Sequence, residues 1–337
     1  MTEPRVTPFR QVKPLVALAP TVGVIAYPWL LRAFHLALVA ERRVLAAAAM
    51  AMVFAVPLIS WLFAARSARA NHTTVHDVRM RRLAYVGVAA PTFFVFLGVV
   101  QGLVHSSVPD EAVWIVGWAG LIFWAWSGSA RQPHIYATGV LSPWRVLHGI
   151  SGGVLLAYLL FHIGNHLFGL EGAAVHAAVM KAGRHVYRAP LIEPILIALF
   201  ILQVFTGFRL AWRWSALPAD WRRVFQIASG FYLSVFILGH MNSVFIYART
   251  VQKVDTGWDF ATGAPTGLLY DAWNIRLLPH YMLGVFFVLA HLASGLRVVL
   301  LAHSVNPRWV NRTWSAGVLI SFAIAAAIIA GMCGARI

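Results

Sequence analysis

The sequence predicts an all-α protein, a polytopic bundle of transmembrane helices, and three observations lead to this prediction. Of the 337 residues, 60% are hydrophobic and only 11% are charged, and the mean hydropathy is +0.73. A soluble core of this size does not need so apolar a composition. Apolar runs of about 20 residues, the length that crosses a bilayer as a helix, recur along the whole chain. Arginines gather between these runs.

Nine apolar runs are counted as spans, and eight is the alternative count. The run at 112–127 is short, and the first two runs could form one tilted hairpin. The first four spans make up an N-terminal region, 1–130, whose function the sequence does not indicate. The last five make up 131–337. The predicted spans lie near residues 14–31, 44–65, 83–104, 112–127, 146–168, 190–208, 224–247, 277–302 and 314–333.

The formal net charge of +16 comes almost wholly from arginine. In a soluble protein this balance would suggest nucleic acid, but loop arginines that orient the spans account for it here, so no nucleic-acid partner is predicted. The segment 66–82 is rich in arginine, whereas 105–111 carries Asp110 and Glu111 and no lysine or arginine. We expect an integral protein of a bacterial inner membrane. Alternation places the N-terminus, 66–82, 128–145, 209–223 and 303–313 in the cytoplasm, and 105–111, 169–189 and 248–276 outside.

The second half of the chain contains a repeat that includes the candidate metal-binding residues. Residues 151–162 read SGGVLLAYLLFH and residues 229–240 read SGFYLSVFILGH. The helix after the first motif contains QVFTGFR at 203–209, and the helix after the second contains HLASGLR at 291–297. Two copies, roughly 146–213 and 224–300, indicate two related halves that enclose a site.

Helix geometry predicts two stacked sites. His162 and His240 each lie sixteen residues into a predicted span, about 24 Å along it, so both lie near the outer side and could bind one metal. Gln203 and His291 lie on the returning helices, about 20 Å from the outer face. They share a level nearer the cytoplasm.

The residue types favour a b-type haem over other metal centres. Carboxylates and thiolates are absent at these depths, which disfavours zinc, non-haem iron and iron–sulfur clusters. The single cysteine, Cys333, excludes an intrachain disulfide. Two neutral imidazoles suit the axial positions of a haem. Glycines including Gly152 and Gly230 would thin the helix faces beside a flat macrocycle, and Arg209 and Arg297 could pair with its propionates.

With these residues in view, 132–337 resembles the cytochrome b membrane anchor of succinate dehydrogenases and fumarate reductases, in its five-helix, two-haem, single-polypeptide form. The resemblance rests on LHGISGGVLLAYLLFHIGNH, LFILQVFTGFRLAW, FQIASGFYLSVFILGH and YMLGVFFVLAHLASGLR. It implies an outer haem held by His162 and His240, and an inner haem held by His291 and the residue at Gln203. Glutamine is a poor iron ligand, so the inner haem is absent, five-coordinate, or bound by another histidine such as His280.

A second stretch, RQPHIYATGVLSPWRVLHGISG, resembles the entry segment of related anchors, in which Ser and Arg beside the His help to bind quinone. Arg145 and Gly149 stand at the matching positions here, so that quinone site is not supported. His148 and Ser151 remain candidates for lining a site. Glu193 is a candidate for proton exchange with quinone, but a first-turn carboxylate favoured by the helix dipole accounts for it better.

The resemblance implies a haem-b anchor that passes electrons between membrane quinone and partner flavoprotein and iron–sulfur subunits at the cytoplasmic face. The chain would then be a quinone-reactive or non-catalytic subunit of an oxidoreductase. Two alternatives stay open. One is a stand-alone transmembrane cytochrome b without a flavoprotein partner, and the other is a haem-free transporter whose halves move around buried histidines.

Overall fold

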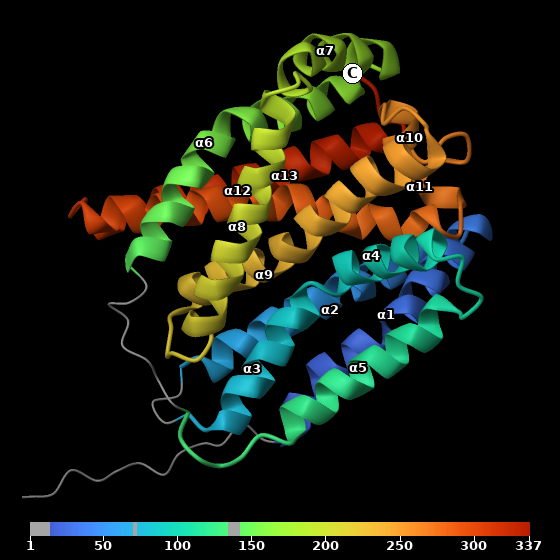
Figure 1. The fold of residues 1–337 in the computed structure, drawn as a ribbon. Helices are drawn as coiled ribbons and strands as arrows, with labels where there is room; N and C mark the ends of the chain where they lie inside the picture. Colours follow the sequence, from blue (N-terminus) through green and yellow to red (C-terminus); the bar gives the residue numbers. More distant parts are fainter. Residues whose placement is uncertain (1–13, 70–72, 134–141) are drawn as a thin grey trace, which may run out of the picture.

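The computed structural model describes residues 14–69, 73–133 and 142–337, and every regular element in these ranges is helical (Figure 1). The predicted all-α membrane bundle is therefore confirmed. The main helices are α1 (Pro14–Val39), α2 (Arg43–Ser67), α3 (Val75–Val88), α4 (Ala90–Leu103), α5 (Asp110–Trp126), α6 (Ser142–Leu167), α7 (Ala173–Tyr187), α8 (Ile192–Trp214), α9 (Trp221–Met241), α12 (Leu277–Ala302) and α13 (Pro307–Met332).

Seven helices in the described ranges are long and apolar enough to cross a membrane, and α3 with α4 makes an eighth if the bent pair is one span. The spanning helices are α1, α2, α6, α8, α9, α12 and α13. Helix α5 is apolar but has 17 residues, about 26 Å of helix against a hydrocarbon core of about 30 Å. The predicted span at 112–127, the fourth along the chain, is this short helix.

The predicted span at 83–104 begins in the wrong place. Instead of one straight helix, the chain forms α3 and α4, which meet at a bend of 67°. Pro91 lies in the first turn of α4. It has no N–H to continue the helix from α3, and its ring would clash with a carbonyl one turn earlier. The bend lets the arginine-bearing half of α3 lie at the end of the bundle.

Helix α9 joins the N-terminal helices to the rest of the bundle. It packs against α2, α3 and α4 on one side and against α8 and α12 on the other. Tyr85 of α3 stacks on Phe231 of α9, with the ring centroids 5.5 Å apart. The regions predicted as 1–130 and 131–337 therefore share one hydrophobic core.

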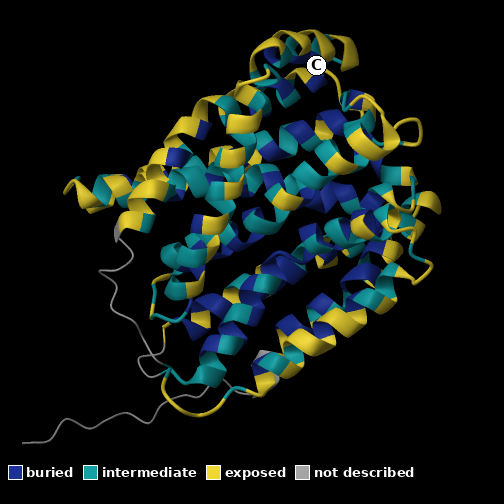
Figure 2. Cartoon of the chain, in the orientation of Figure 1, coloured by how far each residue is buried: buried dark blue, intermediate teal, exposed yellow. Residues whose placement is uncertain are grey.

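The outer faces of the bundle are apolar and exposed, as a bilayer requires. Figure 2 shows exposed residues along α6 and α5, and buried residues concentrated between the central helices. On α6 the exposed side chains include Val146, Ile150, Val154 and Leu160. In a membrane such a surface would contact lipid tails instead of water.

The two ends of the bundle differ in charge. One end, which we call the arginine-rich end, contains the start of α3, α6, α9 and α13; among the described residues its only carboxylates are Asp77 and Asp220. The opposite end, which we call the acidic end, carries the remaining described carboxylates. These are Glu41, Asp110, Glu111, Glu171, Glu193, Asp255, Asp259 and Asp271, accompanied by basic residues such as Arg184, Arg249 and Arg276.

Buried Arg81 connects several segments at the arginine-rich end through hydrogen bonds. Its side chain is 0% exposed. The guanidinium donates to the Ser67 carbonyl at 2.8 Å, to the Ser215 carbonyl at 3.1 Å and to the Leu217 carbonyl at 2.9 Å. One side chain therefore ties the end of α2 to the connection between α8 and α9.

We predict that Arg81→Met destabilises the protein by about 3 kcal/mol or more, because it leaves three buried carbonyls without a donor. The expected result is a lower thermal unfolding temperature in detergent. Arg69→Met is the matched control, since Arg69 is exposed at the same end. Equal unfolding temperatures for both variants would contradict the role of Arg81.

Candidate functional site

The two repeat motifs fold onto four helices. Helices α6 and α9 carry the SG…H motifs, and α8 and α12 carry the motifs that follow them. Helix α6 packs on α8, α8 on α9, and α9 on α12, while the α6 backbone makes few close contacts with α9 or α12. Contacts between α6 and the α9–α12 pair are therefore made by side chains. Histidines make such contacts at two levels along the bundle.

At the first level, near the acidic end, the structure brings together His162 of α6 and His240 of α9. Their ring centroids are 6.0 Å apart and the rings are inclined by 69°. Tyr158 stacks on His162, and Phe236 stacks on His240. Among the described residues neither imidazole has a hydrogen-bond partner. The pair is thus held by aromatic packing, with its ring nitrogens uncommitted.

A line of rings continues from this pair to the acidic end. His166 lies one turn beyond His162, with ring centroids 4.8 Å apart, and His176 of α7 stacks on His166 at 5.4 Å. Asn165 lies 3.2 Å from Nε2 of His176. Burial, helped by the charge of Arg184, lowers the pKa of His176 below its ordinary value. Burial at this place therefore favours the neutral form of His176.

At the second level, nearer the arginine-rich end, the structure differs from the ligand set that the resemblance implied. The side chain opposite His291 of α12 is His148 of α6, with ring centroids 6.4 Å apart and the rings almost perpendicular. Gln203 instead turns its amide to α6, where Nε2 donates to the His148 carbonyl and to Ser151 Oγ, both at 2.8 Å. Gln203 is a hydrogen bonder between helices, because α6 offers two acceptors beside it.

His280, the alternative ligand considered from the sequence, does not face His291. Its ring packs against Phe236 at 4.7 Å and against Tyr281 at 5.1 Å. It is 3% exposed, and its Nδ1 has no partner in the described part of the chain. His280 belongs to the surroundings of the first pair, since Phe236 lies between it and His240.

Hydroxyl groups orient both rings of the second pair. Nδ1 of His148 lies 2.8 Å from Thr206 Oγ1, and Nδ1 of His291 lies 2.8 Å from Ser229 Oγ. The two hydroxyls already donate to backbone carbonyls of Leu202 and Gln226. They therefore accept from the rings, which places the proton on Nδ1 and leaves Nε2 with a free lone pair. This is the usual state of an imidazole prepared to bind a metal.

Two predicted glycines make room for these side chains. A Cβ at Gly152 would lie 3.2 Å from Nε2 of Gln203, and a Cβ at Gly230 would lie 3.4 Å from Cε1 of His291. A third glycine, Gly207, does the same for His148, at 3.1 Å from Cε1. The thin helix faces predicted from the sequence thus fit the imidazoles and the glutamine beside the site.

The two predicted arginines lie between the second pair and the arginine-rich end. Arg209 packs over Trp144, 4.5 Å from the ring centroid, and its buried Nε has no partner within the described ranges. Nε of Arg297 donates to Asn311 at 2.9 Å. Arg209 therefore has a buried nitrogen available to an anionic group.

An interfacial cap covers the acidic end, and the sequence did not predict its main element. Helix α7 lies across this end (Figure 1), where residues 169–189 were expected to form a loop. The segment after α9, in which 248–276 was expected to lie outside the membrane, continues α9 as the π-helix η3 (Asn242–Gln252). It then forms the short helices α10 (Trp258–Thr262), α11 (Gly267–Tyr270) and η4 (Asn274–Arg276).

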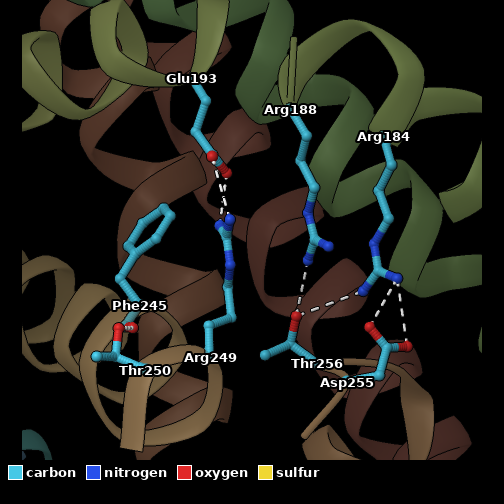
Figure 3. A network of polar contacts seen from close by, with 8 residues as sticks. All are labelled: Arg184, Arg188, Glu193, Phe245, Arg249, Thr250, Asp255 and Thr256. Atoms are coloured by element: carbon cyan, nitrogen blue, oxygen red, sulfur yellow. Dashed lines mark hydrogen bonds and ion pairs between the residues drawn. The ribbon is translucent and has the colours of Figure 1, made fainter. Parts of the chain in front are cut away.

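Ion pairs join the parts of this cap, as Figure 3 shows. Arg184 of α7 contacts Asp255 at 2.9 Å, and Arg188 donates to Thr256 at 2.9 Å. Glu193, at the start of α8, pairs with Arg249 of η3 at 2.6 Å. The carboxylate considered for proton exchange is therefore committed to a structural ion pair.

The described residues contain no group of three or more His, Cys, Asp or Glu side chains that could hold one metal ion. His240, His162, His166 and His176 form one line of rings, and His148 and His291 form a separate pair. Most of the quinone-type entry segment, residues 134–141, lies outside the described residues, as does the N-terminal stretch 1–13. Comparison of the chain with protein-family models, with curated proteins and with solved structures gave no match. The site is therefore interpreted from its own geometry.

We predict that Arg184→Ala loosens the cap by roughly 1 kcal/mol, the scale of a partly exposed ion pair. Backbone amides of α7 should then exchange with deuterium several-fold faster, as measured by mass spectrometry. Lys181→Ala is the control, because Lys181 is exposed on the same helix. Unchanged exchange in the Arg184 variant would show that apolar packing alone holds α7.

Proposed function

We propose that the protein is a transmembrane b-type cytochrome whose outer haem is held by His162 and His240. The observation that carries this proposal is the distance of 6.0 Å between their ring centroids. A ligating imidazole nitrogen lies about 2 Å from its metal and the ring centre about 1 Å further out, so two imidazoles on opposite sides of one metal have ring centres about 6 Å apart.

The donor set supports haem over a bare metal ion. A structural zinc site needs four protein ligands, and a catalytic one needs three. The pairs His162–His240 and His148–His291 each offer two imidazoles from different helices, which is the number that a haem takes. Bound haem would supply one-electron transfer. The chain's own residues bind and orient the group, exclude water with Tyr158 and Phe236, and hold the imidazoles between apolar helices.

Within this class, we propose the haem-b membrane anchor of a succinate dehydrogenase- or fumarate reductase-like complex. Helices α6, α8, α9, α12 and α13 match the five helices of that resemblance in order, and paired imidazoles on α6, α9 and α12 support it. Membrane quinone would exchange electrons with the haem, and flavoprotein and iron–sulfur subunits would lie at the arginine-rich end. The positive-inside bias favours a cytoplasmic arginine-rich end in a bacterial inner membrane.

The proposal is tested by measuring haem in the purified chain with the pyridine haemochrome assay. We expect haem b in the native protein, and we expect His162→Ala and His240→Ala each to lose the same equivalent of haem. Each change removes one of the two axial ligands of one iron. His185→Ala is the control, because His185 is exposed on α7.

Two outcomes would contradict the proposal. A colourless native protein would favour the haem-free transporter. Haem retained with an unchanged spectrum in both variants would show that the cofactor binds at another place. Purification from native membranes tests the anchor assignment separately. Co-purifying flavin and iron–sulfur protein would support it, whereas a haem-containing chain that purifies alone would favour the stand-alone cytochrome.

A further inference from the structure

We propose that a second haem binds between His148 of α6 and His291 of α12, so that one helix, α6, supplies an axial ligand at both levels. The inference rests on the proposed function, because it assumes that the first pair is a haem site. It differs from the ligand set implied by the resemblance, in which the partner of His291 stands at Gln203. In our proposal the partner of His291 comes from α6, whereas the resemblance places it on α8.

The spacing of the second pair matches that of the first. The ring centroids of His148 and His291 are 6.4 Å apart, against 6.0 Å for His162 and His240. His148 and His162 are fourteen residues apart, close to four helical turns, so both rings project from one face of α6. The two levels lie about 21 Å apart along this helix. Two macrocycles can therefore occupy the bundle without overlap.

The second pair is also prepared chemically for ligation. Thr206 and Ser229 accept from Nδ1 of His148 and of His291, as described above, so that Nε2 of each ring is free to bind. Such hydrogen bonds fix the orientation of a ligating imidazole and raise its basicity. Gly207 gives the His148 ring space that a Cβ would restrict, and Gly230 lies beside the His291 ring.

The internal repeat explains how the ligand could move. Ser151 meets Gln203 in the first copy at 2.8 Å, and Ser229 meets His291 in the second copy at the same distance. Three residues before each serine stand His148 and Gln226. Each copy therefore contributes one histidine and one glutamine, in exchanged positions, and the exchange leaves two imidazoles facing each other across the bundle.

Arg209 is a candidate for binding an anionic group at this level. It follows Thr206 and Gly207 on α8, beside His148, and its buried Nε has no partner within the described ranges. A haem carries two propionates, and a guanidinium recognises a carboxylate through charge-assisted hydrogen bonds.

The test counts haem per chain and low-spin ferric signals by electron paramagnetic resonance. We expect two haems in the native protein and one in His148→Ala, with the signal of the His162–His240 haem retained. Gln203→Ala should keep both haems, and this separates the proposed ligand from the residue at the family position. His303→Ala, an exposed residue just after α12, is the matched control.

Failure of this inference is distinguishable from failure of the proposed function. One haem in the native protein, lost in His162→Ala and kept in His148→Ala, would overturn the second site and leave the first. Two haems in the native protein, with one lost in Gln203→Ala and none in His148→Ala, would restore the family ligand and overturn ours. Native protein without haem would overturn both proposals.

A second variant separates ligand loss from misfolding. His148→Gly should lose the same haem signal, and added imidazole should restore it by filling the space that the side chain leaves. Restoration in this variant, and no effect of imidazole on Gln203→Ala, would support direct ligation by His148. No restoration in a variant that keeps the His162–His240 haem would contradict it.

Discussion

The structure depends on one constraint, which is that polar groups inside a bilayer must find partners within the protein. Four helices meet this constraint with short contacts between side chains. Thr206 bonds His148, Ser229 bonds His291, and Gln203 bonds α6 at two points, all at 2.8 Å. These contacts fix helix register as well as ring orientation, because a shift along any one helix would break several of them together.

The N-terminal helices meet the same constraint at the arginine-rich end. Arg81 and Arg82 reach from α3 to the end of α8, where Arg82 also packs over Trp212 at 3.6 Å from the ring centroid. Since α9 carries His240 and packs on α2, α3 and α4, the N-terminal region supports one wall of the candidate site. The described residues of this region are thus packed against the helix that carries one histidine of the first pair.

The spans, the repeat and the pairing of His162 with His240 follow from the sequence because each rests on a local pattern. Apolar length marks a span, and equal distances from the helix start place two residues at one depth. The bend before Pro91 and helix α7 were not predicted. The first needs the position of a proline relative to the whole apolar run, and the second is an amphipathic helix outside the spans, where hydropathy gives little signal.

The sequence by itself determined that this protein is a helical membrane bundle, and it predicted a repeat in the second half with histidines at two levels. Only the tertiary structure decided which side chains face each other at the inner level. His148 and His291 are far apart in the chain, and the repeat gives Gln203, not His148, the position equivalent to His291. Pairing across a bundle depends on the rotation and separation of whole helices, which arise from packing among α6, α8, α9 and α12 rather than from any local pattern.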